Sequence, residues 1–206
     1  LKEECRNPEF VLDDGSYLLW EEPDPERIYV AGVDIAEGVG ENASVIQIFD
    51  FTDLTNITQV AVYSNNKITP YNFTTKLEEI LKNWGDPLVA IERNNCGAQV
   101  VDNLYNNSGY GNLIHFSPNP NKSTGYANRL GVVAHTNTKY KGVMNMRYWV
   151  NEMKAVKFRD IKTINELRDF VRYPNGTWAA KKIAGCLDDR VMSLIWCLII
   201  LENTIT

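Results

Sequence analysis

Three runs of apolar and β-branched residues lie close together in the first third of the chain. They cover residues 28–35, 43–51 and 57–64, and short polar connections separate them. Runs of this length and composition are typical of β-strands, and short connections usually join antiparallel neighbours. The pattern therefore predicts a meander of three antiparallel strands.

Helical spacing follows directly after these strands. Apolar residues recur at helical intervals over 70–81, where Asn72 or Thr74 is placed to cap the helix, and Gly85-Asp86-Pro87 ends it. The pattern next predicts a strand over 88–92, a helix over 97–105 and a short strand over 113–116. The resulting order is β-β-β-α-β-α-β.

The remaining part is predicted to be mainly helical after a long loop. Residues 117–138 are rich in Ser, Asn, Pro, Gly and Thr and show no periodicity, so we expect a functional or mobile loop. Beyond it the pattern predicts helices over 143–153, 161–171 and 188–201, a turn at 174–176 and a strand over 177–180.

Length and composition fit one globular α/β domain. The 206 residues are 44% hydrophobic and 23% charged, which excludes disordered, collagen-like and disulfide-scaffold proteins. Residues 1–27 combine mixed periodicity with clustered acids and two prolines, and we interpret them as an acidic lead-in or linker outside the core. Residues 28–206 would then form the domain.

No leader or membrane span is predicted. The longest apolar stretch, 191–201, is about half as long as a bilayer crossing requires, and the first residues lack a basic-then-apolar leader. The four cysteines form no C-x-x-C pair, which fits a reducing cytosol. We expect a cytoplasmic protein with no signal peptide and no membrane partner.

Charge is distributed unevenly along the chain. Residues 1–26 carry a net charge of −7 and residues 139–190 a net charge of +6, within a total of −5. A basic segment of this kind could bind DNA, although a solvated helical surface has the same composition. Lys139, Lys141 and Arg147 are our preferred phosphate contacts, with ordinary surface charge as the alternative.

Carboxylates stand at three places where the pattern predicts apolar residues. Asp34 and Glu92 each end an apolar strand, and Asp188-Asp189 opens an almost wholly apolar helix. A carboxylate in a sheet interior is costly unless it is paired or bound to a metal, so these residues are functional candidates. The alternatives are a solvent-facing sheet edge for the first two and helix capping for the last pair.

The order of elements gives these acids a common context. Acids on the first and fourth strands and on a late helix resemble the ribonuclease H-like fold of nucleases and polynucleotidyl transferases. That resemblance implies an α/β protein with a mixed central sheet, three antiparallel strands plus parallel ones, and helices on both faces. Hard divalent ions take oxygen ligands, and two of them can clamp the attacking and leaving oxygens of a phosphodiester.

Short motifs around the acids narrow the resemblance. They are D-x-x-E-G at Asp34, a strand-terminal Glu92 before a glycine-containing helix start, and D-D-x-V-M-S-L from Asp188, in that order. Over residues 28–201 they resemble the C-terminal nuclease domain of the large terminase subunit of tailed bacteriophages, most closely the T-even-like group.

The resemblance implies a metal-dependent endonuclease that cuts concatemeric double-stranded viral DNA at the start and end of headful packaging. Asp34, Glu92 and one or both of Asp188 and Asp189 would be catalytic ligands of two Mg²⁺ or Mn²⁺ ions. Asp34 is the candidate bridging ligand, and a helical wheel weakly favours Asp188 over Asp189.

Two residues after Asp34 would support this site. Glu37 would be an accessory ligand or lie just behind the ligands, with a plain surface charge as the equally weighted alternative. Gly38 would allow the backbone to turn sharply beside the site.

The chain contains no G-x-x-x-x-G-K-S/T phosphate loop, so we assign it no ATPase activity and expect a separately expressed, monomeric nuclease domain. In a full-length terminase its partners would be an N-terminal ATPase domain, the portal protein and the small terminase subunit. It would act in the cytoplasm of the infected bacterium, transiently at the procapsid portal.

Two other functions stay open at this point. A RuvC-like junction resolvase or transposase core has the same fold, whereas a portal or DNA docking module would have lost cleavage. His115 and His135 carry little weight because two-metal nucleases activate water on the metal. Trp149, Trp178 and Trp196 are expected to fill core and rim positions.

Overall fold

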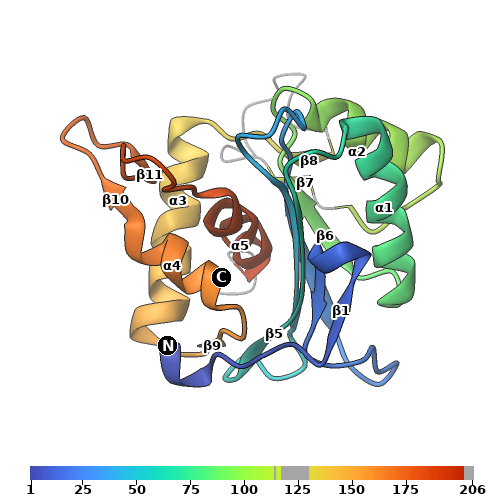
Figure 1. Ribbon diagram of the computed structural model, residues 1–206, viewed down its shortest axis with the longest axis horizontal. Helices are drawn as coiled ribbons and strands as arrows, with labels where there is room; N and C mark the ends of the chain where they lie inside the picture. Colours follow the sequence, from blue (N-terminus) through green and yellow to red (C-terminus); the bar gives the residue numbers. More distant parts are fainter. Residues whose placement is uncertain (114, 117–129, 202–206) are drawn as a thin grey trace.

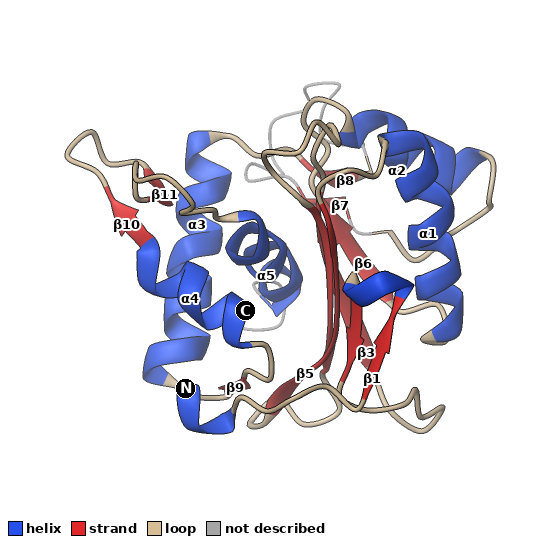
Figure 2. Ribbon diagram, in the orientation of Figure 1, coloured by secondary structure: helices blue, strands red, loops and turns tan. Residues whose placement is uncertain are grey.

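A seven-stranded mixed sheet forms the middle layer of the protein, with helices on both faces (Figures 1 and 2). The computed structural model describes residues 1–113, 115–116 and 130–201. The strand order is β1-β2-β5-β4-β3-β6, and β9 pairs with β5. The strands are β1 (Phe10–Leu12), β2 (Tyr17–Leu19), β3 (Tyr29–Asp34), β4 (Ser44–Asp50), β5 (Ile57–Asn65), β6 (Leu88–Ile91) and β9 (Val156–Lys157).

The central strands confirm the predicted meander. β3 pairs antiparallel with β4, and β4 pairs antiparallel with β5. β3 pairs in parallel with β6, and Val33 lies opposite Ile91. The first and fourth predicted strands are therefore neighbours, and because they are parallel their carboxyl ends reach the same edge of the sheet.

Two helical layers cover the sheet. α1 (Pro70–Asn83) and α2 (Gly97–Asn106) lie on one face, and α3 (Thr136–Arg147), α4 (Ile161–Asp169) and α5 (Asp189–Ile199) lie on the other (Figure 2). Each layer has its own cluster of buried apolar side chains against the sheet. The predicted caps of α1 are wrong, because Thr69 is the N-cap and its hydroxyl oxygen accepts from the backbone N–H of Asn72 at 3.4 Å.

α5 packs directly on the backbone of β3. A Cβ atom at Gly32 would lie 2.1 Å from the carbonyl oxygen of Ser193, so only glycine allows this approach. The Ser193 hydroxyl donates to the Gly32 carbonyl oxygen at 2.8 Å, which gives a buried polar group a partner at the contact. This contact fixes where the N-terminus of α5 lies relative to the ends of β3 and β6.

The expectation that residues 1–27 lie outside the core is wrong. β2 pairs antiparallel with β5, and Tyr17, Leu19 and Trp20 are buried. β5 has a free edge once β4 occupies its other side, and β2 supplies the missing backbone hydrogen bonds. The boundary at residue 28 therefore does not separate the lead-in from the sheet.

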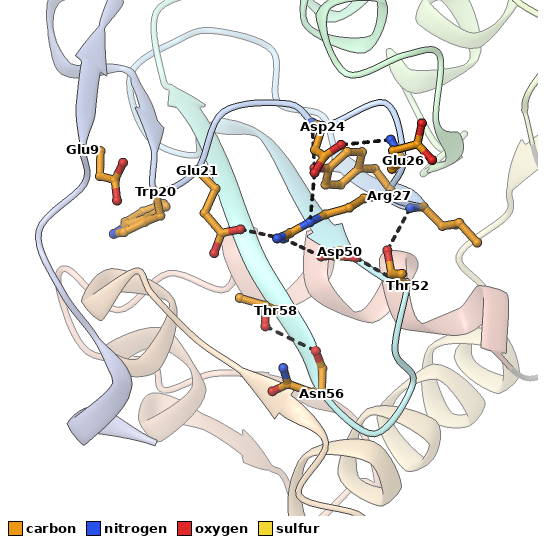
Figure 3. Close-up of polar contacts among 12 residues, drawn as sticks. Glu9, Trp20, Glu21, Asp24, Glu26, Arg27, Asp50, Thr52, Asn56 and Thr58 are labelled. Atoms are coloured by element: carbon orange, nitrogen blue, oxygen red, sulfur yellow. Dashed lines mark hydrogen bonds and ion pairs between the residues drawn. The ribbon is translucent and has the colours of Figure 1, made fainter.

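Several acids of the lead-in are paired rather than free (Figure 3). The Arg27 guanidinium lies 2.9 Å from Glu21, 3.0 Å from Asp50 and 3.6 Å from Asp24. This network ties the segment before β3 to the end of β4. The negative charge of residues 1–26 is thus partly balanced within the fold.

The middle of the chain differs from the prediction in two places. The strand expected over 113–116 is reduced to a bridge between Leu113 and Val89, while β7 (His115–Phe116) pairs with β8 (Gly131–Val132) in a separate small sheet. Part of the predicted loop over 117–138 is structured as β8 and the start of α3, and residues 117–129 lie outside the described residues.

The helix predicted over 143–153 begins earlier, at Thr136, and continues as a π-helical turn over Tyr148–Glu152. Thr138 and Gly142 occupy buried positions of α3, so a search for apolar residues misses its first half. The helices predicted over 161–171 and 188–201 are confirmed as α4 and α5, except that Phe170 and Val171 lie in a strand. That strand, β10 (Phe170–Arg172), pairs as a hairpin with the predicted strand, β11 (Trp178–Ala180). No helix in the described part of the chain could span a membrane.

The contact between β3 and α5 gives a stability prediction. Gly32→Ala should lower the free energy of unfolding by about 3 kcal/mol, because the new Cβ meets backbone atoms that cannot turn away. Urea unfolding measures the loss. Gly111→Ala is the matched control, since no atom lies within 4 Å of a Cβ at that position. Equal stability of the two variants would contradict the proposed close approach.

Candidate metal and nucleic-acid site

Carboxylates from three elements meet where β3 and β6 end. Asp34 is the last residue of β3, Glu92 follows β6, and Asp189 opens α5. Burial raises the pKa of Asp34 well above its usual value. The negative charges of Glu92 and Asp189 raise it further. The site thus concentrates negative charge that the fold does not fully neutralise.

Glu92 is held by contacts from two other elements. The indole N–H of Trp196, on α5, donates to Glu92 Oε2 at 2.9 Å. Burial raises the pKa of Glu92, while the hydrogen bonds from Trp196 and Asp34 and the charge of Lys139 act in the opposite direction. The carboxylate therefore has a defined orientation.

Asp189 is the more deeply placed of the two late acids. It is 5% exposed, and its Oδ2 accepts from the backbone N–H of Ala43 at 2.8 Å. Burial raises the pKa of Asp189 to about 6. The helical wheel weakly favours Asp188. In the structure, however, Asp189 contacts the loop before β4, and a helical wheel does not represent contacts between elements.

Asp188 has a different set of contacts. It occupies the N-cap position of α5 without a capping hydrogen bond from its side chain. Its Oδ2 instead accepts from the backbone N–H of Ala180 at 3.3 Å and lies 3.7 Å from the Lys139 ammonium. Asp188 therefore links α5 to the β10–β11 hairpin and to α3.

An acidic cavity of 260 Å³ opens beside these residues. Asp34, Asp189, Glu37 and Glu41 line it, and none of the described lining residues is basic. Glu37 is exposed and lines this cavity, which fits both the accessory ligand and the plain surface charge that the sequence leaves open. Gly38 has a φ of 77°, which allows the turn that carries the chain away from Asp34.

A buried ionic network fixes the N-terminus of α5. Arg190 Nε donates to Asp160 at 3.0 Å and Nη1 donates to Glu166 at 3.1 Å. The backbone N–H of Arg190 also donates to Glu166, at 2.7 Å, so Glu166 satisfies a helix N-terminus that Asp188 does not cap. Through Arg190, α4 holds the segment that carries both late acids.

The three predicted phosphate contacts are not equivalent in the structure. Lys139 is near the acids through its ion pair with Asp188. Arg147 lies at the opposite end of α3, with its guanidinium 5.7 Å from the centre of the Trp178 ring. Lys141 is exposed. The ion pair with Asp188 thus brings Lys139 to the site.

Carboxylate oxygens are the donors that Mg²⁺ and Mn²⁺ prefer, and burial together with neighbouring acids raises the pKa values of Asp34 and Glu92. The chemistry of the donor set therefore fits a hard divalent cation. As the side chains stand, no group of three or more His, Cys, Asp or Glu among the described residues is arranged to hold a metal. Binding would require the carboxylates to turn toward a common centre.

Sequence reasoning missed two residues that shape the site. Trp196 was expected only to fill the core, yet it bonds to Glu92, and Arg190 was not singled out at all. An arginine at the start of an otherwise apolar helix was the available signal for Arg190, because a buried charge requires partners. No local pattern identifies the partner of Trp196.

The raised pKa of Asp189 gives a pH prediction for the metal-free protein. The folded state holds this proton more tightly than the unfolded chain, so the free energy of unfolding should fall as the pH rises from about 4 to about 6. Asp189→Asn should remove about 3 kcal/mol of that decline. Urea unfolding in EDTA across this window measures it.

The exposed Glu22 supplies the matched control, because Glu22→Gln should leave the pH dependence as in the wild type. A decline of the same size in Asp189→Asn would contradict the raised pKa of the buried Asp189 carboxyl.

Solved structures with the same architecture are nuclease domains of phage large terminases. The large terminase nuclease from thermophilic phage G20c with bound magnesium is 20% identical, with a TM-score of 0.68 over 96% of this chain and 93% of that chain. The Thermus phage P74-26 large terminase nuclease domain is also 20% identical, with a TM-score of 0.65 over 95% and 90%.

The g2p nuclease domain from bacteriophage SPP1 with bound Mn is 11% identical, with a TM-score of 0.54 over 98% of this chain and 97% of that chain. No protein-family model matches the chain. These phages are not T-even phages, so the similar structures do not support the narrower T-even resemblance. The chain has the ribonuclease H-like fold that these large terminase nuclease domains share.

Proposed function

We propose that this chain is a metal-dependent DNA endonuclease domain of a viral packaging terminase. The observation that carries the proposal is the meeting of Asp34, Glu92 and Asp189 at the end of two parallel central strands. Such a cluster of acids is costly to fold, and a bound cation would relieve the cost. The fold shared with terminase nucleases, some with bound magnesium or Mn, supports the same function.

The three acids would have different tasks. The negative charges of Glu92 and Asp189 both raise the pKa of Asp34, so Asp34 would be the ligand that bridges the set. Glu92 would enter with one oxygen already fixed by Trp196, and Asp189 or Asp188 would complete the set from α5. Two bound Mg²⁺ or Mn²⁺ ions would supply an activated water and stabilise charge on the phosphodiester oxygens.

Lys139 would hold DNA close to these acids. Its ammonium group is already placed beside Asp188, and a phosphate there would offer it a second anionic partner. Lys141 and Arg147, farther along α3, would extend the contact along the DNA backbone. Glu37 would act as an accessory ligand from the rim of the acidic cavity.

The biological reaction would be cutting of concatemeric double-stranded viral DNA at the initiation and termination of headful packaging. In a complete terminase, an ATPase domain, the portal protein and the small terminase subunit would work with this domain in the cytoplasm of the infected cell. The segment over residues 1–27 would lead from the ATPase domain into β3 while its middle part pairs with β5.

Asp34→Asn should abolish cleavage of plasmid DNA in Mg²⁺ or Mn²⁺, since it removes the central charge and keeps the side-chain shape. Gel analysis of supercoiled plasmid, with and without EDTA, measures it. Asp53→Asn, an exposed acid in the turn after β4, should cut like the wild type. Wild-type cleavage by Asp34→Asn would contradict the assignment, and absence of metal-dependent cleavage by the wild type would favour a docking module.

Metal binding should also raise thermal stability. Millimolar Mn²⁺ should increase the Tm of the wild type, because the ion neutralises acids that repel one another in the folded state. The increase should vanish in Asp34→Asn and persist in Asp53→Asn. Differential scanning fluorimetry provides the reading, and an equal increase in all three proteins would indicate nonspecific ion effects instead.

DNA binding should depend on Lys139 without regard to sequence. Lys139→Ala should weaken binding and reduce the slope of log K against log salt by about 1, the value for one lost phosphate contact. Fluorescence anisotropy with labelled duplexes at several salt concentrations tests this. Lys82→Ala, on α1 across the sheet, should leave the slope unchanged. The path of the DNA would lie elsewhere if Lys139→Ala kept the wild-type slope.

A further inference from the structure

We propose that Trp196 is a positioning residue that fixes the carboxylate of Glu92 for metal binding. The inference rests on the proposed function, because it assigns a task within the proposed metal site. Its basis is the hydrogen bond of 2.9 Å between the indole N–H of Trp196 and Glu92 Oε2. Neither the fold comparison nor the acid pattern points to this residue.

The position of Trp196 along α5 connects it to the late acids. It follows Asp189 by seven residues, which is nearly two helical turns and places the two side chains on the same face about 10 Å apart along the axis. α5 packs against β3, β4 and β6. One rigid helix therefore presents an acid at its start and an indole donor farther along to the same edge of the sheet.

The chemistry of the indole suits a fixed support. The indole N–H can donate one hydrogen bond. The ring offers no hydrogen-bond acceptor, and its N–H does not ionise near neutral pH. The last torsion angle of a glutamate side chain is otherwise broadly distributed. A buried donor on Oε2 restricts that torsion and so fixes the direction in which Oε1 points.

The contact is not a general consequence of burying tryptophan. Within the described residues, the indole nitrogens of Trp149 and Trp178 are buried and have no hydrogen-bond partner. Trp196 is fully buried, and its ring lies 3.8 Å from where a Cβ of Gly142 would stand on α3. Gly142 of α3 thus packs beside the ring while the indole N–H donates to Glu92.

Loss of such a support usually weakens metal binding by about 10- to 100-fold. We expect Trp196→Phe, which keeps an aromatic ring but removes the donor, to weaken Mn²⁺ binding at least tenfold. Isothermal titration calorimetry of the metal alone gives this value without any DNA or activity measurement.

Trp84→Phe is the matched control. Trp84 is also almost fully buried, and its indole N–H donates to the Tyr17 hydroxyl at 2.7 Å on the opposite face of the sheet. Both substitutions remove one buried indole hydrogen bond, so a purely structural effect would appear in both. The inference requires Mn²⁺ affinity within about twofold of the wild type for Trp84→Phe.

A second measurement uses folded protein even if Trp196→Phe is unstable. In ¹H–¹⁵N spectra, Glu92→Gln should shift one indole N–H signal, that of Trp196, and the same signal should shift when Mg²⁺ is added to the wild type. The Trp84 signal, assigned with Trp84→Phe, should stay in place.

These measurements distinguish the positioning role of Trp196 from the proposed nuclease function. Equal Mn²⁺ affinities of Trp196→Phe and Trp84→Phe, or an indole signal that responds to Glu92→Gln but not to Mg²⁺, would overturn the positioning role and leave the nuclease proposal standing. If the wild type binds no metal in calorimetry, both the proposed function and the role of Trp196 are overturned.

Discussion

The direct contact between Gly32 of β3 and the backbone of α5 is the constraint on which the candidate site depends. Any side chain at Gly32 would collide with Ser193, so the helix lies closer to the sheet than a side chain would permit. The bond from Ser193 to the Gly32 carbonyl oxygen supports this position. Because β3 and β6 are parallel neighbours, a helix packed this closely on the sheet reaches the ends of both strands. It brings the charge of Asp189 close enough to raise the pKa of Asp34, and it places the indole N–H of Trp196 where it donates to Glu92.

The electrostatics of the site follow from this close packing. Burial raises the pKa of Asp34, Glu92 and Asp189, so the folded metal-free protein is strained by charge that it cannot fully compensate. Partial compensation comes from a backbone N–H at Ala43, an indole N–H at Trp196 and the ammonium of Lys139. The Arg190 guanidinium donates to Asp160 and Glu166 rather than to Asp34, Glu92 or Asp189, so it stabilises the N-terminus of α5.

The sequence predicts well what depends on local periodicity. Strong apolar patterns identify β3, β4, β5, α1 and β6. That β3 and β6 are neighbours came from the resemblance to the ribonuclease H-like fold, and the structure confirms it. β2 was missed because its pairing depends on the free edge of β5, which no local signal describes. The choice between Asp188 and Asp189, and the partner of Trp196, depend on contacts between residues more than 100 positions apart.

Above all, we propose that the acids at the ends of β3 and β6 and at the start of α5 hold a divalent cation. Anomalous diffraction from crystals soaked in Mn²⁺ tests it most directly, because it locates the ion without reference to activity. We predict an anomalous peak in contact with the Asp34 carboxylate and with Glu92 or Asp189. Ordered Mn²⁺ only at other places, or no peak at concentrations that raise the Tm, would contradict the claim.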